Sequence, residues 1–326
     1  MFLKRLFRGS VGSRTLQEDL DLYRASVLVS LCNSGSSDVD SVSRSLLQQG
    51  RSSWARVLRS ALGVQMHDLF AHVALMGGAD AYPMPKQKRQ KVLQGSPLER
   101  ALDMKGRDLD IEEKPVAHPS AGWKMRVAKS GIQHRAAGFG VVVEGFVPAG
   151  SVVCIYPGKI WWPGTYAGPP DNEYAISRYD GVIVDALHWD TKARESAMQQ
   201  HARLEAGASG KPEAEERFRN PFALGSFVNH PPPGEQPNVM QVPYEFKKDL
   251  RYVPHEMGSD RRPLYMLDSF LDSTPSIVLI ATRNLRDEEL FLNYRFNPAL
   301  PYPDWYSQPD LEEATRRWAK HSFFFV

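Results

Sequence analysis

The segment from Phe139 to Gly158, FGVVVEGFVPAGSVVCIYPG, constrains the fold most. Its β-branched and aromatic residues form short runs, and glycine or proline interrupts each run within a few residues. This pattern predicts short strands joined by tight turns, because branched side chains suit a pleated sheet and glycine and proline suit turns. YDGVIVDAL and PSIVLIATRNL repeat it further along the chain. We therefore expect a β-rich domain over residues 120–297.

Residues 18–110 have a helical pattern instead. Apolar residues recur at spacings of three and four in LQEDLDLYRASVLVSLCNSGSS, SDVDSVSRSLLQQG and SSWARVLRSALGVQMHDLFAHVALMGG, and each stretch ends in glycine or in glycine and serine. His67 and His72 are five residues apart, which is not the spacing of two metal ligands on one helix face. The chain is therefore predicted to be α+β, with a helical N-terminal region and a polar insertion around residues 187–219.

Composition excludes several classes of protein. The 326 residues are 42% hydrophobic and 24% charged, and the net charge is +2, so the chain is no nucleic-acid polycation. No apolar run is long enough to span a membrane. Two cysteines are too few for a disulfide framework or a cysteine-rich zinc site. We expect no metal, no membrane and no sequence-specific nucleic-acid binding.

Residues 1–17 form a basic N-terminal arm. Four basic residues precede the first acidic residue, Glu18, and the apolar residues of MFLKRLF fall on one helical face. An amphipathic, arginine-rich segment of this kind fits a mitochondrial presequence, as a minority interpretation. It equally fits a basic arm that contacts phosphate or a partner. The apolar core of a secretory signal is missing.

Four motifs in the β-rich half carry candidate chemistry. The first is the turn Gly138–Gly140, and the second is the strand YDGVIVDA with Asp185. In the third, an apolar run ends at Asn229 and His230 and three prolines follow at once. In the fourth, an acidic turn leads through a short apolar strand to Tyr294 in TRNLRDEELFLNYRF. Taken alone, Asn229 before prolines is an ordinary turn residue.

The order of these motifs resembles that of the SET-domain protein lysine methyltransferases, over roughly Gly131 to Phe296. The resemblance implies a SET-domain fold of small curled sheets, in which the segments ending at His230 and Tyr294 cross in a knot-like arrangement. It also implies that S-adenosyl-L-methionine binds on one face of the crossing and that a target lysine of a protein substrate enters from the other.

The resemblance also implies roles for particular residues. Tyr294 would be the catalytic tyrosine. The cofactor would be bound by Gly138, Phe139, Gly140, Asn229, His230 and Tyr294. Five aromatic residues are candidates for the wall of the substrate channel, with core packing as the alternative for each: Tyr156, Tyr174, Phe227, Phe291 and Phe296.

These residue types suit methyl transfer. Displacement at a sulfonium methyl group by an amine needs alignment and no nucleophilic side chain. The amine must be neutral, because an ammonium has no lone pair, and a dry aromatic channel lowers the pKa of a lysine by desolvation. A tyrosine hydroxyl such as that of Tyr294 can orient the amine by hydrogen bonding.

Several departures from the family pattern leave the activity open. PPPGEQ separates His230 from the following Pro-Asn pair, Asn293 replaces the usual aspartate before the tyrosine, and the cysteine-rich module that often completes the channel is absent. The alternatives are an enzyme acting on histones or on other proteins, and a catalytically weak SET-fold binding module in a chromatin-associated complex. The resemblance slightly favours the nucleus over the cytoplasm.

The C-terminal tail, residues 298–326, is rich in aromatic residues and ends in Phe-Phe-Phe-Val. Leaving such side chains in water is costly, at roughly 1.5–3 kcal/mol for each large apolar side chain that is not buried. We therefore expect the tail to dock on the domain or on a partner, and we hypothesise that it forms a lid over the lysine channel.

Overall fold

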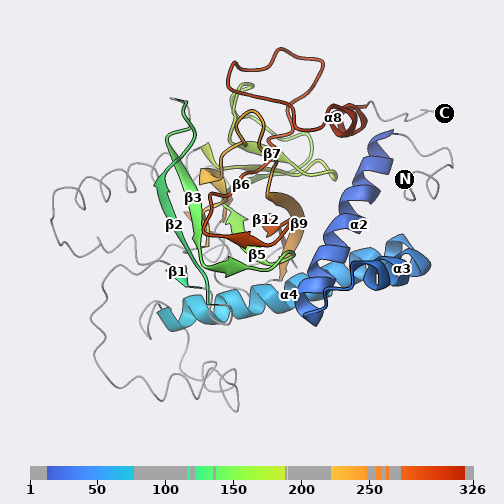
Figure 1. Ribbon diagram of the computed structural model, residues 1–326. Helices are drawn as coiled ribbons and strands as arrows, with labels where there is room; N and C mark the ends of the chain where they lie inside the picture. The colour runs from blue at the N-terminus through green and yellow to red at the C-terminus, as the bar shows by residue number, and fades with distance from the viewer. Residues whose placement is uncertain are drawn as a thin grey trace, which may run out of the picture.

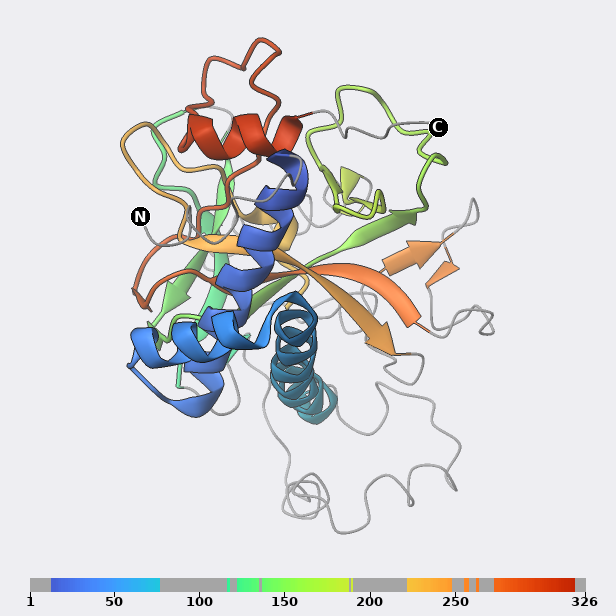
Figure 2. The ribbon, with the colours of Figure 1, turned by 90° about the vertical axis from the view of Figure 1, so that its right-hand side faces the viewer.

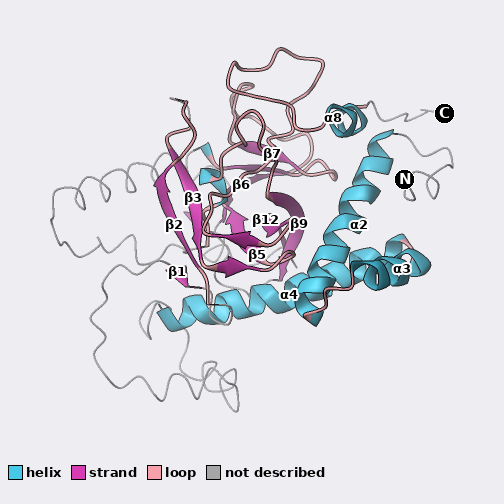
Figure 3. Ribbon diagram, viewed as in Figure 1, coloured by secondary structure: helices cyan, strands magenta, loops and turns pink. Residues whose placement is uncertain are grey.

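The computed structural model describes residues 13–76, 116–117, 122–134, 137–187, 189, 222–247, 255–257, 262–263 and 273–319. Most of the predicted basic arm, almost all of the insertion predicted around residues 187–219 and the terminal Phe-Phe-Phe-Val lie outside these residues. The first described helix begins at Ser13, so the end of the predicted arm belongs to a helix. Figures 1 and 3 show helices on one side of a group of small sheets.

Three helices form the N-terminal region, as predicted: α2 (Ser13–Ser34), α3 (Val39–Gln49) and α4 (Arg51–Met76). The carboxylate of Asp38 caps α3 by accepting a hydrogen bond from the backbone N of Ser41 at 2.9 Å. Gly50 ends the helix with a φ of 77° and donates to the carbonyl of Leu46. Leucine, tryptophan and tyrosine side chains between α2, α3 and α4 form a small apolar cluster of their own.

Within the described residues the strands form four small sheets. The first has the order β1 (Val116–Ala117), β2 (Lys124–Lys129), β3 (Phe139–Glu144). The second has the order β11 (Arg262–Pro263), β10 (His255–Met257), β6 (Gly158–Trp161), β8 (Ile183–Asp185), β7 (Ala175–Ser177). The third has the order β5 (Val152–Tyr156), β12 (Ser273–Ala281), β9 (Val239–Lys247), and the fourth pairs β13 (Leu285–Arg286) with β4 (Phe146–Val147). All pairs are antiparallel except β10 with β6.

The third sheet forms the centre of the molecule. Every residue of β5 is buried, and β12 is buried from its second residue to its end. A strand covered on both faces has no polar face, which explains why VVCIY and SIVLIA are continuous apolar runs. Figure 2 shows α2 lying across this sheet, with the short helix α8 (Leu311–Trp318) at one end of α2.

Helices α2 and α4 pack directly on this sheet and share its hydrophobic core. The side chain of Gln65, on α4, replaces a strand partner at the edge of the sheet. Its Oε1 accepts a hydrogen bond from the backbone N of Val152 at 2.6 Å, and its Nε2 donates to the carbonyl of Gly150 at 3.1 Å. The helical region is therefore joined to the β-rich part by buried polar and apolar contacts.

Candidate functional site

The segments that end at His230 and Tyr294 run side by side. Asn229 and Phe291 form a parallel β-bridge. The backbone N of Leu292 donates to the carbonyl of Asn229 at 2.8 Å, and the hydroxyl of Tyr294 donates to the carbonyl of Val228 at 3.2 Å. The two ends, which are 64 residues apart in the chain, therefore meet, as the resemblance implies.

Asn229 is held in place by a carboxylate that no local pattern identifies. The side-chain Nδ2 of Asn229 donates to the carbonyl of Phe139 and to Oε1 of Glu289, at 3.1 Å each. Glu289 also accepts hydrogen bonds from Ser130 Oγ at 2.7 Å and, at Oε2, from the backbone N of Gly131 at 2.9 Å. The amide nitrogen of Asn229 thus joins the glycine turn to the segment that ends at Tyr294.

The carboxylate of Glu289 leaves no room for a side chain at position 140. A Cβ at position 140 would overlap the carboxylate of Glu289, with Cδ at 2.8 Å, and would lie 3.1 Å from Asn229 Nδ2. Real Cβ atoms do not approach other atoms this closely, so any side chain here would displace Glu289. The close approach at Gly140 is made by the side chain of Glu289.

His230 has hydrogen-bond partners at both ring nitrogens. Nε2 lies 2.8 Å from the carbonyl of Ser307, which can only accept, and Nδ1 accepts from the backbone N of Tyr294 at 3.4 Å. These partners select the neutral tautomer with its proton on Nε2. The ring is buried and stacks on Tyr306 with centroids 4.2 Å apart. The side chain of His230 therefore joins the tail to the crossing, and its ring nitrogens are already used.

Burial lowers the pKa of His230 below its ordinary value, although the backbone carbonyl of Ser307 opposes the shift. As the pH falls through about 6.5, the unfolded chain therefore binds a proton before the folded protein does. The contribution of neutral His230 to the free energy of unfolding is fully present above this pH and decreases below it.

We expect urea unfolding between pH 8 and pH 5 to show this loss of unfolding free energy in the wild type and to show less of it in His230→Gln. The control is His67→Gln, whose side chain is 80% exposed; parallel curves for all three proteins would contradict the expectation.

Tyr294 lies at the centre of an aromatic cluster built by the crossing and the tail. Its ring lies 5.6 Å from His230 and 5.9 Å from Trp305 between centroids. Phe296 stacks on Tyr306 at 4.7 Å, and Tyr306 stacks on His230. Offset and edge-to-face aromatic contacts of this kind each add to the stabilisation by burial. The first part of the tail therefore docks on the domain, whereas the terminal Phe-Phe-Phe-Val, on which the docking prediction rests, lies outside the described residues.

A pocket of about 330 Å³ opens beside this cluster. This volume lies at the lower end of the range of ligand pockets, about 300–1,000 Å³. The pocket lies where the loop before β3, the loop before β7, the crossing and the tail come together. The residues that line it are Ile132, Gln133, His134, Ala137, Glu173, Tyr174, Asn229, His230, Pro232, Pro233, Tyr294, Asp304 and Trp305.

The structure brings only some of the predicted site residues to this pocket. Tyr174, Asn229, His230 and Tyr294 line it, and Gly138, Phe139 and Gly140 follow directly after its residue Ala137. Their contacts with a cofactor or substrate stay predictions.

The other predicted aromatic residues do not line the pocket. Tyr156 is buried, and its hydroxyl donates to the carbonyl of Tyr174 at 3.0 Å, which holds the backbone of a wall residue. Phe227 is buried in the hydrophobic core. Phe291 lies in the bridge to Asn229, and Phe296 belongs to the aromatic cluster. Phe227 therefore has the surroundings expected from core packing, which is the alternative to a place in the wall of the substrate channel.

Several pocket residues were not predicted. Pro232 and Pro233, which belong to the proline run after His230, form part of the wall. His134 and Asp304 both line the pocket, and Nε2 of His134 lies 3.9 Å from Oδ1 of Asp304. Glu173 directly precedes Tyr174 in the wall. Only the proline run gave a signal in the sequence, because a histidine or carboxylate in a loop has no local pattern.

Among the residues that the structure describes, no group of three or more histidine, cysteine, aspartate or glutamate side chains could hold a metal ion. No helix in the described part of the chain is long and apolar enough to cross a membrane.

Comparison with known proteins finds matches only among solved structures: no family model and no curated protein matches the sequence. Three of these structures are "crystal structure of KRYPTONITE in complex with mCHG DNA and SAH" (18% identity, TM-score 0.28), KRYPTONITE in complex with mCHH DNA, H3(1-15) peptide and SAH (17%, 0.28), and the methyltransferase domain of human Histone-lysine N-methyltransferase SETMAR (18%, 0.27). They align with 54%, 58% and 54% of this chain, which spans only 24%, 27% and 45% of theirs. The function of the chain is therefore argued below from its own geometry.

Proposed function

We propose that this chain is an S-adenosyl-L-methionine-dependent protein-lysine N-methyltransferase. The observation that supports this best is the pocket of about 330 Å³ at the crossing, where Asn229, His230 and Tyr294 meet. Within the family, the segments Asn220 to Asn229 and Glu288 to Tyr294 look most similar to the animal protein called SET-domain-containing protein nine.

The pocket fits a positively charged ligand. The aromatic residues Tyr174, Tyr294 and Trp305 line it, and an aromatic face attracts a sulfonium cation. The carboxylates of Glu173 and Asp304 line it too and add negative charge. These residues, together with the backbone of Asn229 and His230, would hold S-adenosyl-L-methionine, which supplies an activated methyl group when bound.

The chain's own part in the reaction is orientation. The hydroxyl of Tyr294 donates its proton to the carbonyl of Val228, and a tyrosine oxygen can also accept a hydrogen bond from an N–H of a substrate amine. The aromatic rings around it exclude water and so favour the neutral amine. No side chain has to act as a nucleophile, because the amine attacks directly. Trp305, in the tail, closes one side of the pocket and is the residue that supports the lid hypothesis.

Titration calorimetry with S-adenosyl-L-methionine and S-adenosylhomocysteine tests the cofactor. We expect both to bind with micromolar affinity. Ala137→Trp places an indole in the pocket wall and should abolish binding. Val64→Trp, on the exposed side of α4, is the matched control and should bind like the wild type. A folded wild-type protein that gives no heat with either compound would overturn the proposal.

Transfer of a labelled methyl group to histones and to a cell lysate tests the reaction. Label recovered as methyl-lysine supports the enzyme and identifies its substrate, which we propose to be a histone or another protein in the nucleus or cytoplasm. Binding without any transfer would favour the alternative, a catalytically weak SET-fold binding module in a chromatin-associated complex. Asn293, which replaces an aspartate next to Tyr294, is the residue that favours this alternative.

A further inference from the structure

The segment from residue 295 to residue 317, here called the tail loop, begins and ends at nearly the same place. The indole Nε1 of Trp318 donates to the carbonyl of Arg295 at 2.8 Å, so the two ends touch. Between these ends lie Trp305, which lines the pocket, and Ser307, whose carbonyl accepts from His230. Whatever holds the two ends together therefore also holds this wall of the pocket.

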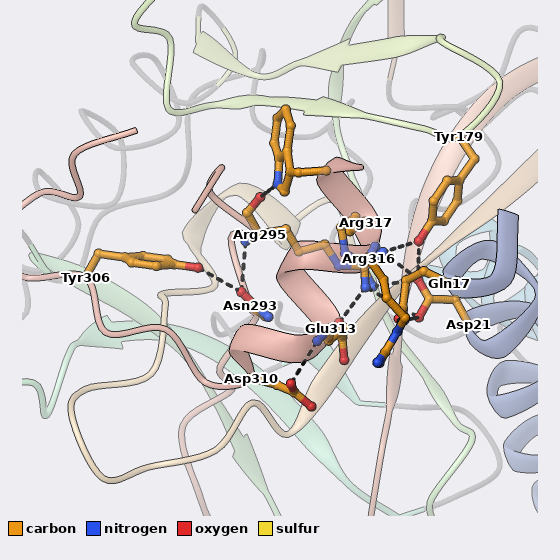
Figure 4. A network of polar contacts seen from close by, with 11 residues as sticks. Gln17, Asp21, Tyr179, Asn293, Arg295, Tyr306, Asp310, Glu313, Arg316 and Arg317 are labelled. Carbon is orange, nitrogen blue, oxygen red and sulfur yellow. Dashed lines mark hydrogen bonds and ion pairs between the residues drawn. The ribbon is translucent and has the colours of Figure 1, made fainter. Parts of the chain in front are cut away.

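One carboxylate, that of Asp21 on α2, contacts both ends of the tail loop (Figure 4). Its Oδ2 lies 2.6 Å from Nη1 of Arg317 and 3.5 Å from Nη2 of Arg295. The hydroxyl of Tyr179 donates to the same oxygen at 2.8 Å. One turn earlier on α2, Gln17 Oε1 accepts from Nε of Arg316 at 2.8 Å. Helix α2 thus contacts both α8 and the start of the tail loop through these side chains.

The charges of Asp21, Arg295 and Arg317 depend on one another because all three side chains are largely buried. The side chains of Asp21, Arg295 and Arg317 are only 15%, 12% and 9% exposed. Burial acts to raise the pKa of Asp21, but the guanidinium groups of Arg295 and Arg317 outweigh it and hold that pKa well below its ordinary value. Burial, and then the positive charge of Arg317, lower the pKa of Arg295. Without the carboxylate, two buried positive charges would repel each other.

Arg295 directly follows Tyr294 and has an unusual backbone conformation. Its φ is 60°, in the left-handed region that a residue with a side chain seldom adopts. Its backbone N donates to Oδ1 of Asn293 at 2.8 Å, and the hydroxyl of Tyr306 donates to the same oxygen at 3.3 Å (Figure 4). A conformation of this kind persists only where the surroundings enforce it. The contacts of Arg295 therefore help to set the orientation of Tyr294.

We propose that Asp21 is a positioning residue for the candidate site: by binding Arg295 and Arg317 it closes the tail loop and fixes Tyr294 and Trp305 at the pocket. This inference rests on the proposed function for its effect on catalysis. Asp21 acts through the two arginines, since it does not line the pocket of Tyr294. The N-terminal helix α2 is accordingly part of the functional unit.

Asp21→Asn tests this in the full chain, with Asp19→Asn as the matched control. Asp19 is a buried carboxylate on the same helix, but it pairs with Arg51 of α4 and not with the tail loop. We expect kcat, counted per binding site for S-adenosylhomocysteine, to fall by roughly 10²-fold in Asp21→Asn, as a misplacement of about 1 Å does. KM should change much less. Asp21→Glu keeps the carboxylate and should recover part of the loss, and Asp19→Asn should retain the wild-type kcat.

Hydrogen exchange, measured by mass spectrometry, gives a readout that needs no activity. Protection of the amides in the tail loop should fall in Asp21→Asn and stay unchanged in Asp19→Asn. If Asp21→Asn does not fold, Arg317→Lys carries the same expectation, because lysine keeps the charge and loses the fork of donors.

The outcomes separate this inference from the proposed function. Unchanged kcat per site and unchanged protection in the altered protein would overturn the positioning role, even where the wild type transfers methyl groups. Conversely, lost protection in a protein whose wild type transfers no methyl group would support the role of Asp21 in closing the loop and count against the proposed enzyme.

Discussion

Tyr294→Phe is expected to lower the turnover of methyl transfer by roughly 10²-fold, the usual cost of losing one preorganised polar group at a reacting centre. The change removes a single oxygen atom. That oxygen donates its proton to the carbonyl of Val228, and a hydroxyl oxygen can also accept an N–H of a substrate amine and so hold it in line. Binding of S-adenosylhomocysteine should stay close to that of the wild type, because the ring and its contacts with His230 and Trp305 remain. Single-turnover transfer of labelled methyl, with calorimetry in parallel, measures both quantities.

Tyr302→Phe is the matched control for this experiment. Its hydroxyl also makes one hydrogen bond, from Gln308 Nε2 at 3.1 Å, and its ring also packs on the aromatic cluster through Tyr306. It does not line the pocket. Each variant should lose only about 1 kcal/mol of unfolding free energy, the net contribution of one hydrogen bond. If Tyr294→Phe turns over like Tyr302→Phe, the hydroxyl of Tyr294 serves packing alone.

The parts of the fold that sequence predicts are those set by local patterns. Apolar periodicity and the glycine at position 50 indicate α2, α3 and α4, because helix hydrogen bonds join residues four apart. Runs such as VVCIY likewise indicate strands. The pairing of β5 with β12 joins Ile155 to Val278, which are far apart in the chain, and no spacing in the sequence predicts it. The meeting of the segments that end at His230 and Tyr294 was predicted from the resemblance of four motifs to those of a known family, and their knot-like arrangement stays a prediction.

The candidate site was predicted in its residue types but not in its hydrogen bonds. Asn229, His230 and Tyr294 lie together, yet their polar atoms bind Glu289, Ser307 and Val228. Ser307 is 77 residues from His230, and Arg317 is 296 residues from Asp21. Contacts at such separations depend on how whole elements pack, so a single sequence carries no signal for them.

One consequence of the packing is that a glycine far from the pocket controls the stability of the molecule. Gly150 lies in the turn between β4 and β5, with a φ of +84°. A Cβ at this position would overlap the backbone carbonyl group of Leu28, in the middle of α2, and would lie 2.9 Å from the backbone N of Val29. Backbone atoms of a helix cannot turn aside as a flexible side chain can. Gly150→Ala must therefore push α2 away from the sheet.

We expect Gly150→Ala to lower the free energy of unfolding by more than about 4 kcal/mol, which places it among the largest effects of single substitutions. Gly164→Ala separates backbone strain from the steric clash with α2, since Gly164 has a similar φ of +77° and nothing within 4 Å of the added methyl. Backbone strain alone should cost this control about 1–2 kcal/mol. Guanidinium unfolding of both variants measures the difference. If both lose the same amount, the clash with α2 contributes nothing, and the N-terminal helices are not packed against the central sheet as tightly as the shared core requires. A clear excess for Gly150→Ala would instead show that α2, which also carries Asp21, has one fixed position from which it can hold the tail loop.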